Sequence, residues 1–382
     1  MRSVPAQRKN PIRKKSSSRP SNHKRSSGAG NKKLINRGTK KYFSQMAVGG
    51  IIFLTAFIFL AGYSIYKYLN QAFASASSPN SYSITDSNIV SLSFIEVESI
   101  TADPVILKGL KYIVFDKNDE KISIFDLPLS LKVDMTGKFG EEEISKVFAL
   151  GALNSTDVVE DGIKTVNNTV MRIFGFSIDR YILVNEGSAE TLLNSFSGHG
   201  LSEILNLQVA SDLKKYTISD LSITEYYSLV KFSGGLVKDR ISMYSVTQRD
   251  IDDSTNLDGQ IADMNFDGDV AREELSVSIL NGTDYPGVAL FGARLVTNSG
   301  GRVVAVSNAS SRYDASYIIT DIRDSATLSY LSRVLGIKNV ISKEEAQRFN
   351  ENEVDRSDIT VIDPSTLSFL PPSQIRAGDY IF

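Results

Sequence analysis

The sequence predicts an α/β (α+β) protein with three parts: an N-terminal transmembrane helix, a larger α/β domain, and a small sandwich domain with the element order β-α-β-β-α-β. Three observations predict this class. A long uninterrupted apolar stretch covers residues 47–66. Strand-like segments alternate with helix-like segments after residue 88, which is typical of layered α/β proteins. A short region near the C-terminus, residues 274–363, repeats the alternation with clear glycine punctuation.

The charge distribution supports a membrane-spanning helix. Residues 1–41 contain 14 of the 42 basic residues and no acidic one. The rest of the chain therefore contains 28 basic and all 44 acidic residues, a net charge of about −16. The stretch 47–66 is long enough to cross a hydrocarbon core as a helix. Basic residues concentrate before it, so we expect the N-terminus to stay cytoplasmic and the rest to be exoplasmic. A cleaved signal peptide is the alternative, but its apolar core is usually shorter.

The tail 1–41 is rich in Ser, Pro, Gly and basic residues, and we expect it to be disordered. Its expected partner is anionic lipid rather than nucleic acid, because no aromatic residues are interleaved to stack on bases. The chain has no Cys and two His residues, so disulfides and multi-histidine metal sites are excluded.

A spacer, 75–88, leads into the first folded domain, 89–247. Apolar periodicity there predicts alternating strands and helices. The predicted strands are 89–97, 112–115, 121–125, 180–184 and 240–246, and the predicted helices are 140–151, 162–174, 189–196 and 224–230. We expect the second and third of these strands to form a hairpin around the polar turn 116–120.

An acidic linker, 248–273, is expected to separate this domain from the second, and residues 364–382 form a tail. For the second domain the pattern predicts an antiparallel sheet with helices on one face. Its predicted strands are 276–280, 303–306, 317–320 and 359–362, and its predicted helices are 288–296, 325–335 and 343–349.

The second domain resembles the C-terminal domain of LytR–CpsA–Psr envelope proteins. The resemblance covers about 274–363 and includes VSILNGTDYPGVALFGARLVTNSGGRVVAVSNAS. Positions that match the family pattern are Leu280, Asn281, Gly282, Gly287, Gly300 and Asn308. More distantly, residues 91–247 resemble the core domain of the same family. The resemblance implies phosphoryl transfer, in which active members move a glycopolymer from a polyprenyl pyrophosphate carrier to the cell wall, using several arginines and a magnesium ion held by aspartates.

This sequence departs from that pattern where the chemistry is carried out. After Pro128, Leu129 and Ser130 replace the family's Arg-Asp, and the arginine-rich insertion is missing at residues 195–201. A leucine cannot donate a hydrogen bond to a phosphate. Three arginines remain, at positions 172, 180 and 240, and we expect them to be isolated surface charges. The resemblance therefore implies a reduced, inactive relative.

One motif lies outside the resemblance. Residues 263–274 match the calcium-binding loop of EF-hands. The candidate ligands are Asp263, Asn265, Asp267, Asp269 and Glu274. These oxygen donors suit calcium, although we expect no flanking helices because a strand follows almost at once. The alternative interpretation is an acidic linker without a metal.

These observations predict a non-catalytic, membrane-anchored envelope protein that binds or organises cell-wall polymer or other envelope proteins. No cofactor other than calcium is expected. The alternative is a phosphotransferase of the LytR–CpsA–Psr type with rearranged residues, which would need a cationic cleft. The acidic region after residue 66 disfavours that alternative, because negative charge repels a pyrophosphate.

Overall fold

The computed structural model describes residues 48–64, 67, 82–85, 87–135, 139–198, 215–264, 268–284 and 286–363. Residues 48–64 are helical, and their large apolar side chains, such as Phe53 and Phe59, are exposed. Residues 47, 65 and 66 of the predicted span, the tails 1–41 and 364–382, and most of the spacer lie outside the described residues. Across the described segments, no helix combines the length and the apolar character needed to cross a membrane.

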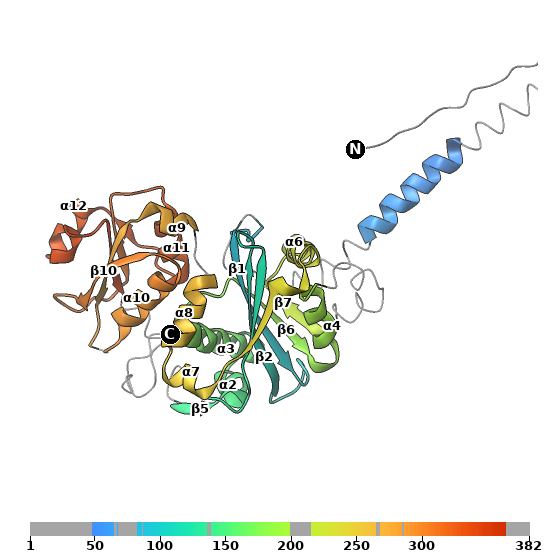
Figure 1. Cartoon of the computed structure of the whole chain (residues 1–382), viewed down its shortest axis with the longest axis horizontal. Coiled ribbons are helices and arrows are strands. Elements are labelled where there is room, and N and C mark those ends of the chain that lie inside the picture. Colours follow the sequence, from blue (N-terminus) through green and yellow to red (C-terminus); the bar gives the residue numbers. More distant parts are fainter. Residues whose placement is uncertain are drawn as a thin grey trace, which may run out of the picture. The chain divides into compact units, whose positions relative to one another are not determined.

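The first sheet has six strands in the order β7-β6-β1-β2-β3-β8. Figure 1 labels β1, β2, β6 and β7 among them. Its strands are β1 (Ile89–Val97), β2 (Leu107–Asp116), β3 (Lys121–Asp126), β6 (Arg180–Asn185), β7 (Thr217–Ser219) and β8 (Ile241–Ser245). The predicted hairpin is confirmed, because β2 and β3 pair antiparallel with Asp116 opposite Lys121. The central strand β1 pairs antiparallel with β2 and parallel with β6. A separate two-stranded ribbon, β4 (Lys132–Asp134) and β5 (Glu141–Glu143), was not predicted.

Helices cover both faces of this sheet. One face packs against α2 (Ile144–Gly151) and α3 (Val158–Phe174), and the other packs against α4 (Glu186–Phe196) and α6 (Ile223–Gly234). Aromatic rings fill both layers. On the first face the rings of Tyr112 and Phe174 stack with centroids 4.4 Å apart, and on the second the rings of Phe115 and Phe196 meet edge to face at 5.5 Å. Such pairs add to the stability from apolar burial.

The expected acidic linker is largely helical and partly buried. It forms α7 (Gln248–Asp252), α8 (Thr255–Met264) and α9 (Gly268–Glu273). Leu257 and Ile261 are fully buried in the core formed by α2, α3 and the first sheet. Their i, i+4 spacing places both on one face of α8. Residues 63–382, where they are described, form one compact unit that contains both sheets.

The second sheet has the order β10-β9-β13-β11-β12. Its elements are β9 (Ser276–Asn281), α10 (Val288–Asn298), β10 (Arg302–Asn308), β11 (Tyr317–Ile319), α11 (Ala326–Val334), β12 (Val340–Ile341), α12 (Lys343–Ala346) and β13 (Ile359–Asp363). The expected antiparallel sheet with helices on one face is wrong. All pairs are parallel except β11 with β13, and the residues around α12 cover the face opposite α10 and α11.

Burial explains this difference. Every residue of β9 is buried, a pattern typical of a parallel strand that is covered on both sides.

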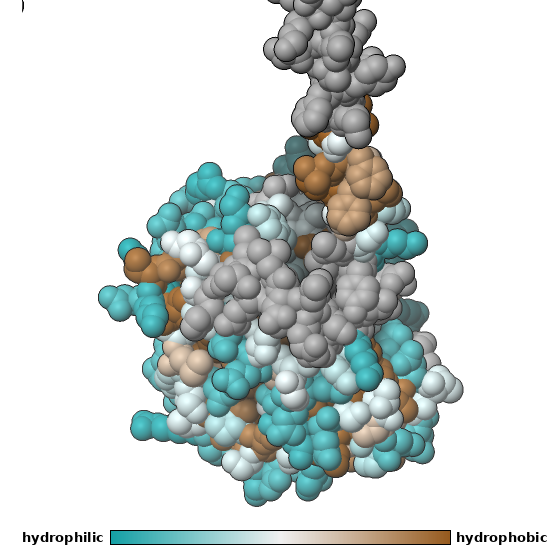
Figure 2. Space-filling model, turned by 90° about the vertical axis from the view of Figure 1, so that its right-hand side faces the viewer, coloured by the Kyte–Doolittle hydropathy of each residue, from teal (hydrophilic) through white to brown (hydrophobic). Residues whose placement is uncertain are grey.

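The face of the molecule visible in Figure 2 mixes hydrophilic side chains with small apolar patches.

Candidate functional site

The turn in which the resembled family carries Arg-Asp is part of the core here. Leu129 lies in a turn after β3 and packs against the core beneath α2 and α3, while Ser130 is exposed. The Leu129 carbonyl accepts a hydrogen bond from the Ser145 amide at 3.0 Å, and the Pro128 carbonyl accepts one from Leu131 at 3.1 Å. The turn is therefore hydrogen-bonded to the first turn of α2, and its leucines Leu129 and Leu131 pack into the core. Of the junction 195–201, where the family's insertion is missing, residues 199–201 lie outside the described residues, as do residues 202–214.

Arg180 is not an isolated surface charge, so this expectation is wrong. Its side chain is 3% exposed and pairs with Glu225 of α6, with 2.8 Å between Nη2 and Oε1. The partner lies 45 residues further along the chain, so the pairing depends on α6 covering the sheet next to β6. Arg240 is exposed, as expected. Arg172 is half-buried and donates to the backbone carbonyl of Asp134.

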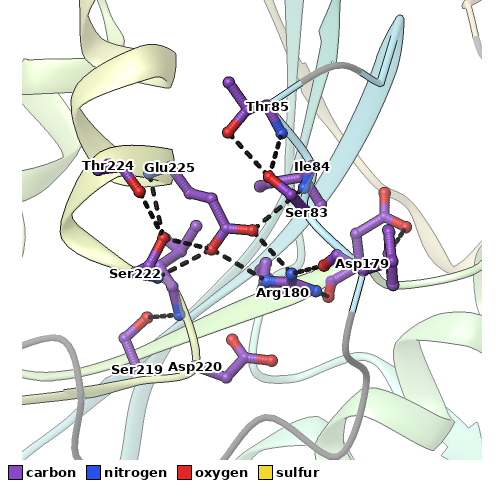
Figure 3. Close-up of polar contacts among 12 residues, drawn as sticks. Ser83, Ile84, Thr85, Asp179, Arg180, Ser219, Asp220, Ser222, Thr224 and Glu225 are labelled. Carbon is purple, nitrogen blue, oxygen red and sulfur yellow. Dashed lines mark hydrogen bonds and ion pairs between the residues drawn. The ribbon is translucent and has the colours of Figure 1, made fainter.

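Arg180 and Glu225 are the centre of a buried polar cluster (Figure 3). Arg180 also donates to the backbone carbonyls of Asp179, at 2.8 Å, and Tyr82, at 2.6 Å. Glu225 accepts from the amides of Ile84 and Ser222 and from the Ser222 hydroxyl, so it completes the capping box of α6. Burial opposes ionisation of Glu225, but the hydrogen bonds from Arg180, Ser222 and Ile84 outweigh it and lower its pKa.

Tyr82 lies between two guanidinium groups. The Arg180 and Arg333 guanidinium carbons are 4.9 and 4.4 Å from the centre of its ring, at distances typical of cation–π contacts. Its hydroxyl donates to Asp179, which also accepts from the amide and hydroxyl of Ser91 at 2.8 and 3.0 Å. Burial and the nearby Asp179 charge raise the pKa of Tyr82. Because Arg333 lies in the last turn of α11, this contact joins the second domain to the first.

A pocket of about 170 Å³ opens beside this cluster. It is lined by Tyr82, Asn167, Asn168, Met171, Ser177, Ile178, Asp179, Arg333 and Val334. The lining residues come from the segment before β1, from α3, from the loop before β6 and from α11. Sequence reasoning did not find this pocket. The Asn167-Asn168 pair within an otherwise amphipathic helix was the one local signal that could have indicated it.

Asp220 lies at the edge of the same cluster, directly before α6 (Figure 3). Its Oδ1 accepts a hydrogen bond from the Tyr181 amide at 2.7 Å. Burial raises the pKa of Asp220 to about 7, although this hydrogen bond and the Arg180 charge oppose the shift. The folded protein therefore binds more protons than the unfolded chain between pH about 4 and 7, and this carboxyl group reduces stability as the pH rises through that window.

We expect Asp220→Asn to stabilise the protein at high pH. The amide keeps an acceptor for Tyr181 but carries no charge. The free energy of unfolding of the variant should be higher than that of the wild type by about 2 kcal/mol at pH 8 and nearly equal to it at pH 4. The value at pH 8 is about half of what the pKa shift of Asp220 would give in full, because water partly reaches the carboxyl group. Urea titrations at both pH values measure this, with the exposed Asp324→Asn as a control. An equal effect at pH 4 and pH 8 would contradict the assignment.

The residues of the second domain that match the family pattern lie around the C-terminal end of β9. Asn281 Oδ1 accepts from the amide and hydroxyl of Thr283 at 2.9 and 2.7 Å. A Cβ on Gly282 would lie 3.2 Å from the Ile362 side chain, and Gly287, the residue before α10, has φ 93°, a backbone conformation that favours glycine. Leu280 is buried on the face toward α12, and the exposed Asn308 lies opposite Asn281. Their arrangement builds the strand–helix connection.

The calcium-loop prediction is only partly covered by the structure. Asn265 and Asp267 lie outside the described residues, and only the backbone of Asp263, in the last turn of α8, is described. Asp269 pairs with Arg272 on α9, and Glu274 follows this helix with φ 49°. The expectation of no flanking helices is wrong on the N-terminal side, because α8 leads into the loop, and α9 lies within its second half; after Glu274 the chain enters β9 at Ser276, as expected. The side chains in the described part of the chain form no cluster of three or more acidic or histidine groups suited to a metal.

Comparison with known proteins finds only weak structural similarities. No family model and no curated protein matches the chain. Among solved structures, TagV from B. subtilis is 13% identical with a TM-score of 0.34, covering 42% of this chain and 85% of that one. TagT bound to LIIa-WTA is 12% identical with a TM-score of 0.31, covering 44% and 81%. A transcriptional regulator from Enterococcus faecalis is 10% identical with a TM-score of 0.32, covering 44% and 79%. Likenesses this low assign no family.

Proposed function

We propose that this chain is a non-catalytic, membrane-anchored protein of the cell envelope that binds or organises a partner near the cell wall. The proposal rests on the burial of Arg180 and its ion pair with Glu225. A phosphotransferase needs cations that face an open site where charge develops on phosphate oxygens. Arg180 instead faces Glu225, with both side chains almost fully buried.

A pyrophosphate could reach Arg180 only by displacing a carboxylate that already has five hydrogen-bond donors around it. Displacing Glu225 would leave a buried negative charge without its partner, which is costly. Arg172 and Arg240 do not converge on this cluster. Arg240 is exposed near Asp119, and Arg172 caps the backbone of the β4–β5 ribbon.

The filled interior of the first domain also supports a binding or scaffold role. Both faces of its sheet are packed with aromatic and aliphatic side chains, and Leu129 adds to that packing. A lipid chain entering either layer would have to displace them. Densely packed cores tolerate little added volume.

The membrane anchor is part of this proposal. Its support is the uninterrupted apolar sequence 47–66 and the change from a basic to an acidic chain across it. In this arrangement the acidic domains face the exoplasmic side, and the basic tail meets anionic lipid in the cytoplasmic leaflet.

The full chain should neither retain nor cleave a polyprenyl pyrophosphate. Because the proposed anchor would insert into any vesicle, the chain is reconstituted into vesicles that carry the lipid, and the measurements are the lipid retained by the chain after detergent extraction and the phosphate released, with and without magnesium. Control vesicles should carry the same negative charge on ordinary phospholipid, because the tail 1–41 binds any anionic surface. A variant lacking that tail separates the two effects. Turnover that disappears in Arg172→Ala or Arg240→Ala would favour the phosphotransferase alternative.

A further inference from the structure

We infer that the pocket lined by Asn167, Asn168 and Ser177 binds a pendant acetamido group, the neutral –NH–CO–CH₃ substituent of an N-acetylated sugar. The inference deepens the proposed function, on which the envelope setting of the ligand rests. The class of ligand follows from the pocket itself.

The pocket holds polar groups that the described protein does not satisfy. Ser177 is 6% exposed, yet its Oγ has no hydrogen-bond partner among the described residues. Asn167 uses its Oδ1 to accept from Ser93 at 2.7 Å, so its amide nitrogen is left to donate. The side chain of Asn168 makes no hydrogen bond to the described residues. A buried hydroxyl such as that of Ser177 usually has a partner, so this exception calls for an explanation, and the half-buried Asn167 and Asn168 line the same pocket.

The charge balance favours a neutral ligand. Asp179 borders the pocket, but Tyr82 and Ser91 donate to it and Arg333 lies 3.7 Å away. The neighbouring Arg180 is balanced by Glu225. An added carboxylate or phosphate would meet the negative charge of Asp179, and an added cation would meet that of Arg333. A neutral group that both donates and accepts matches the remaining amides and hydroxyl.

Size and apolar lining select the acetamido group within this class. At about 170 Å³ the pocket is smaller than the roughly 300–1,000 Å³ typical of sites for drug-sized ligands. Met171, Ile178 and Val334 contribute apolar surface, which suits a methyl group. A substituent that projects from a sugar ring can enter such a space alone. A backbone peptide group is flanked by chain on both sides and would have to bring that chain with it.

The test is methyl NMR of the full chain in detergent micelles. The protein has six methionines, and Met171 lines the pocket, so its ¹³C-methyl signal reports occupancy and is assigned with Met171→Leu. We expect N-acetylglucosamine to shift this signal saturably, and glucosamine and glucose to leave it unchanged. Asn168→Leu should weaken binding about tenfold and Ser177→Ala about threefold, as expected for the loss of one or two hydrogen bonds. Asn194→Leu, also half-buried on a helix, is the matched control and should bind like the wild type.

Several results would overturn the inference. Equal shifts with glucose would remove the role of the acetamido group. Stronger binding of a blocked peptide, N-acetylalanine methylamide, would replace the sugar by a peptide. Unchanged affinity in both Asn168→Leu and Ser177→Ala would place the ligand elsewhere. None of these results depends on polyprenyl pyrophosphate, so the inference can fail while the non-catalytic proposal stands.

Discussion

Glu225→Ala is expected to lower the free energy of unfolding by about 3–5 kcal/mol, because it leaves the Arg180 guanidinium buried without its counter-charge. The change also removes half of the capping box of α6 and the acceptor for the Ile84 amide. Urea denaturation followed by circular dichroism measures the loss. Replacing both partners, in Arg180→Met with Glu225→Leu, should recover more than half of it, because the unpaired charge is then gone.

The matched control is Glu142→Ala. Glu142 pairs with Lys146 at 2.8 Å across one turn, but both side chains reach solvent. Such surface pairs contribute little, so the control should change stability by no more than about 0.5 kcal/mol. If Glu225→Ala cost no more than Glu142→Ala, Arg180 would have to be reaching water, and the buried cluster would not exist in solution.

The second large effect is expected at Arg294, which joins the two sheets. Its guanidinium binds Asp258 of α8, with Nη2 2.6 Å from Oδ1, and donates to the carbonyls of Arg172 and Ile173 at the end of α3. Arg294→Met should reduce the free energy of unfolding by about 2–3 kcal/mol, since three acceptors lose a charged donor. It should also divide one unfolding transition into two, because each sheet then unfolds with less support from the other.

The control for this prediction is Arg272→Met. Arg272 pairs with Asp269 on α9 through side chains that are 74% and 53% exposed. The same chemical change there should be nearly neutral. Calorimetry distinguishes the two variants. A single, unshifted transition in Arg294→Met would show that the contact between α8, α10 and α3 does not couple the sheets.

The local elements were predictable from the sequence, and the long-range contacts were not. Alternating or continuous apolar runs located β1, β3, β6 and β9, because burial imposes a period on each strand. The linker was misjudged because its acidic composition concealed Leu257 and Ile261, which stabilise α8 through tertiary packing. The sheet order in the second domain depended on which faces were covered, and short strands such as β12 leave too few residues to show this.

The candidate site could not be predicted from the sequence for the same reason. Arg180 and Glu225 are ordinary charged residues in the sequence, and nothing near either one indicates its partner. Tyr82 and Arg333 are 251 positions apart in the sequence, yet the Arg333 guanidinium lies over the Tyr82 ring. Spacing can indicate candidate sites whose residues lie within one loop, as in the predicted calcium motif. It does not identify a pocket whose lining residues come from the segment before β1, from α3 and α11, and from the loop before β6.

The attachment of residues 82–85 has a mechanical consequence. Tyr82 and Ile84 are bonded through their backbones to Arg180 and Glu225, and the Tyr82 ring contacts Arg333 of α11. Tension applied to the chain before Tyr82 therefore acts on β6, α6 and α11 together, and not on β1 alone. Because β1 lies between β6 and β2, such a pull must shear several hydrogen-bonded strands at once. A tether attached in this way resists extension until the whole fold yields.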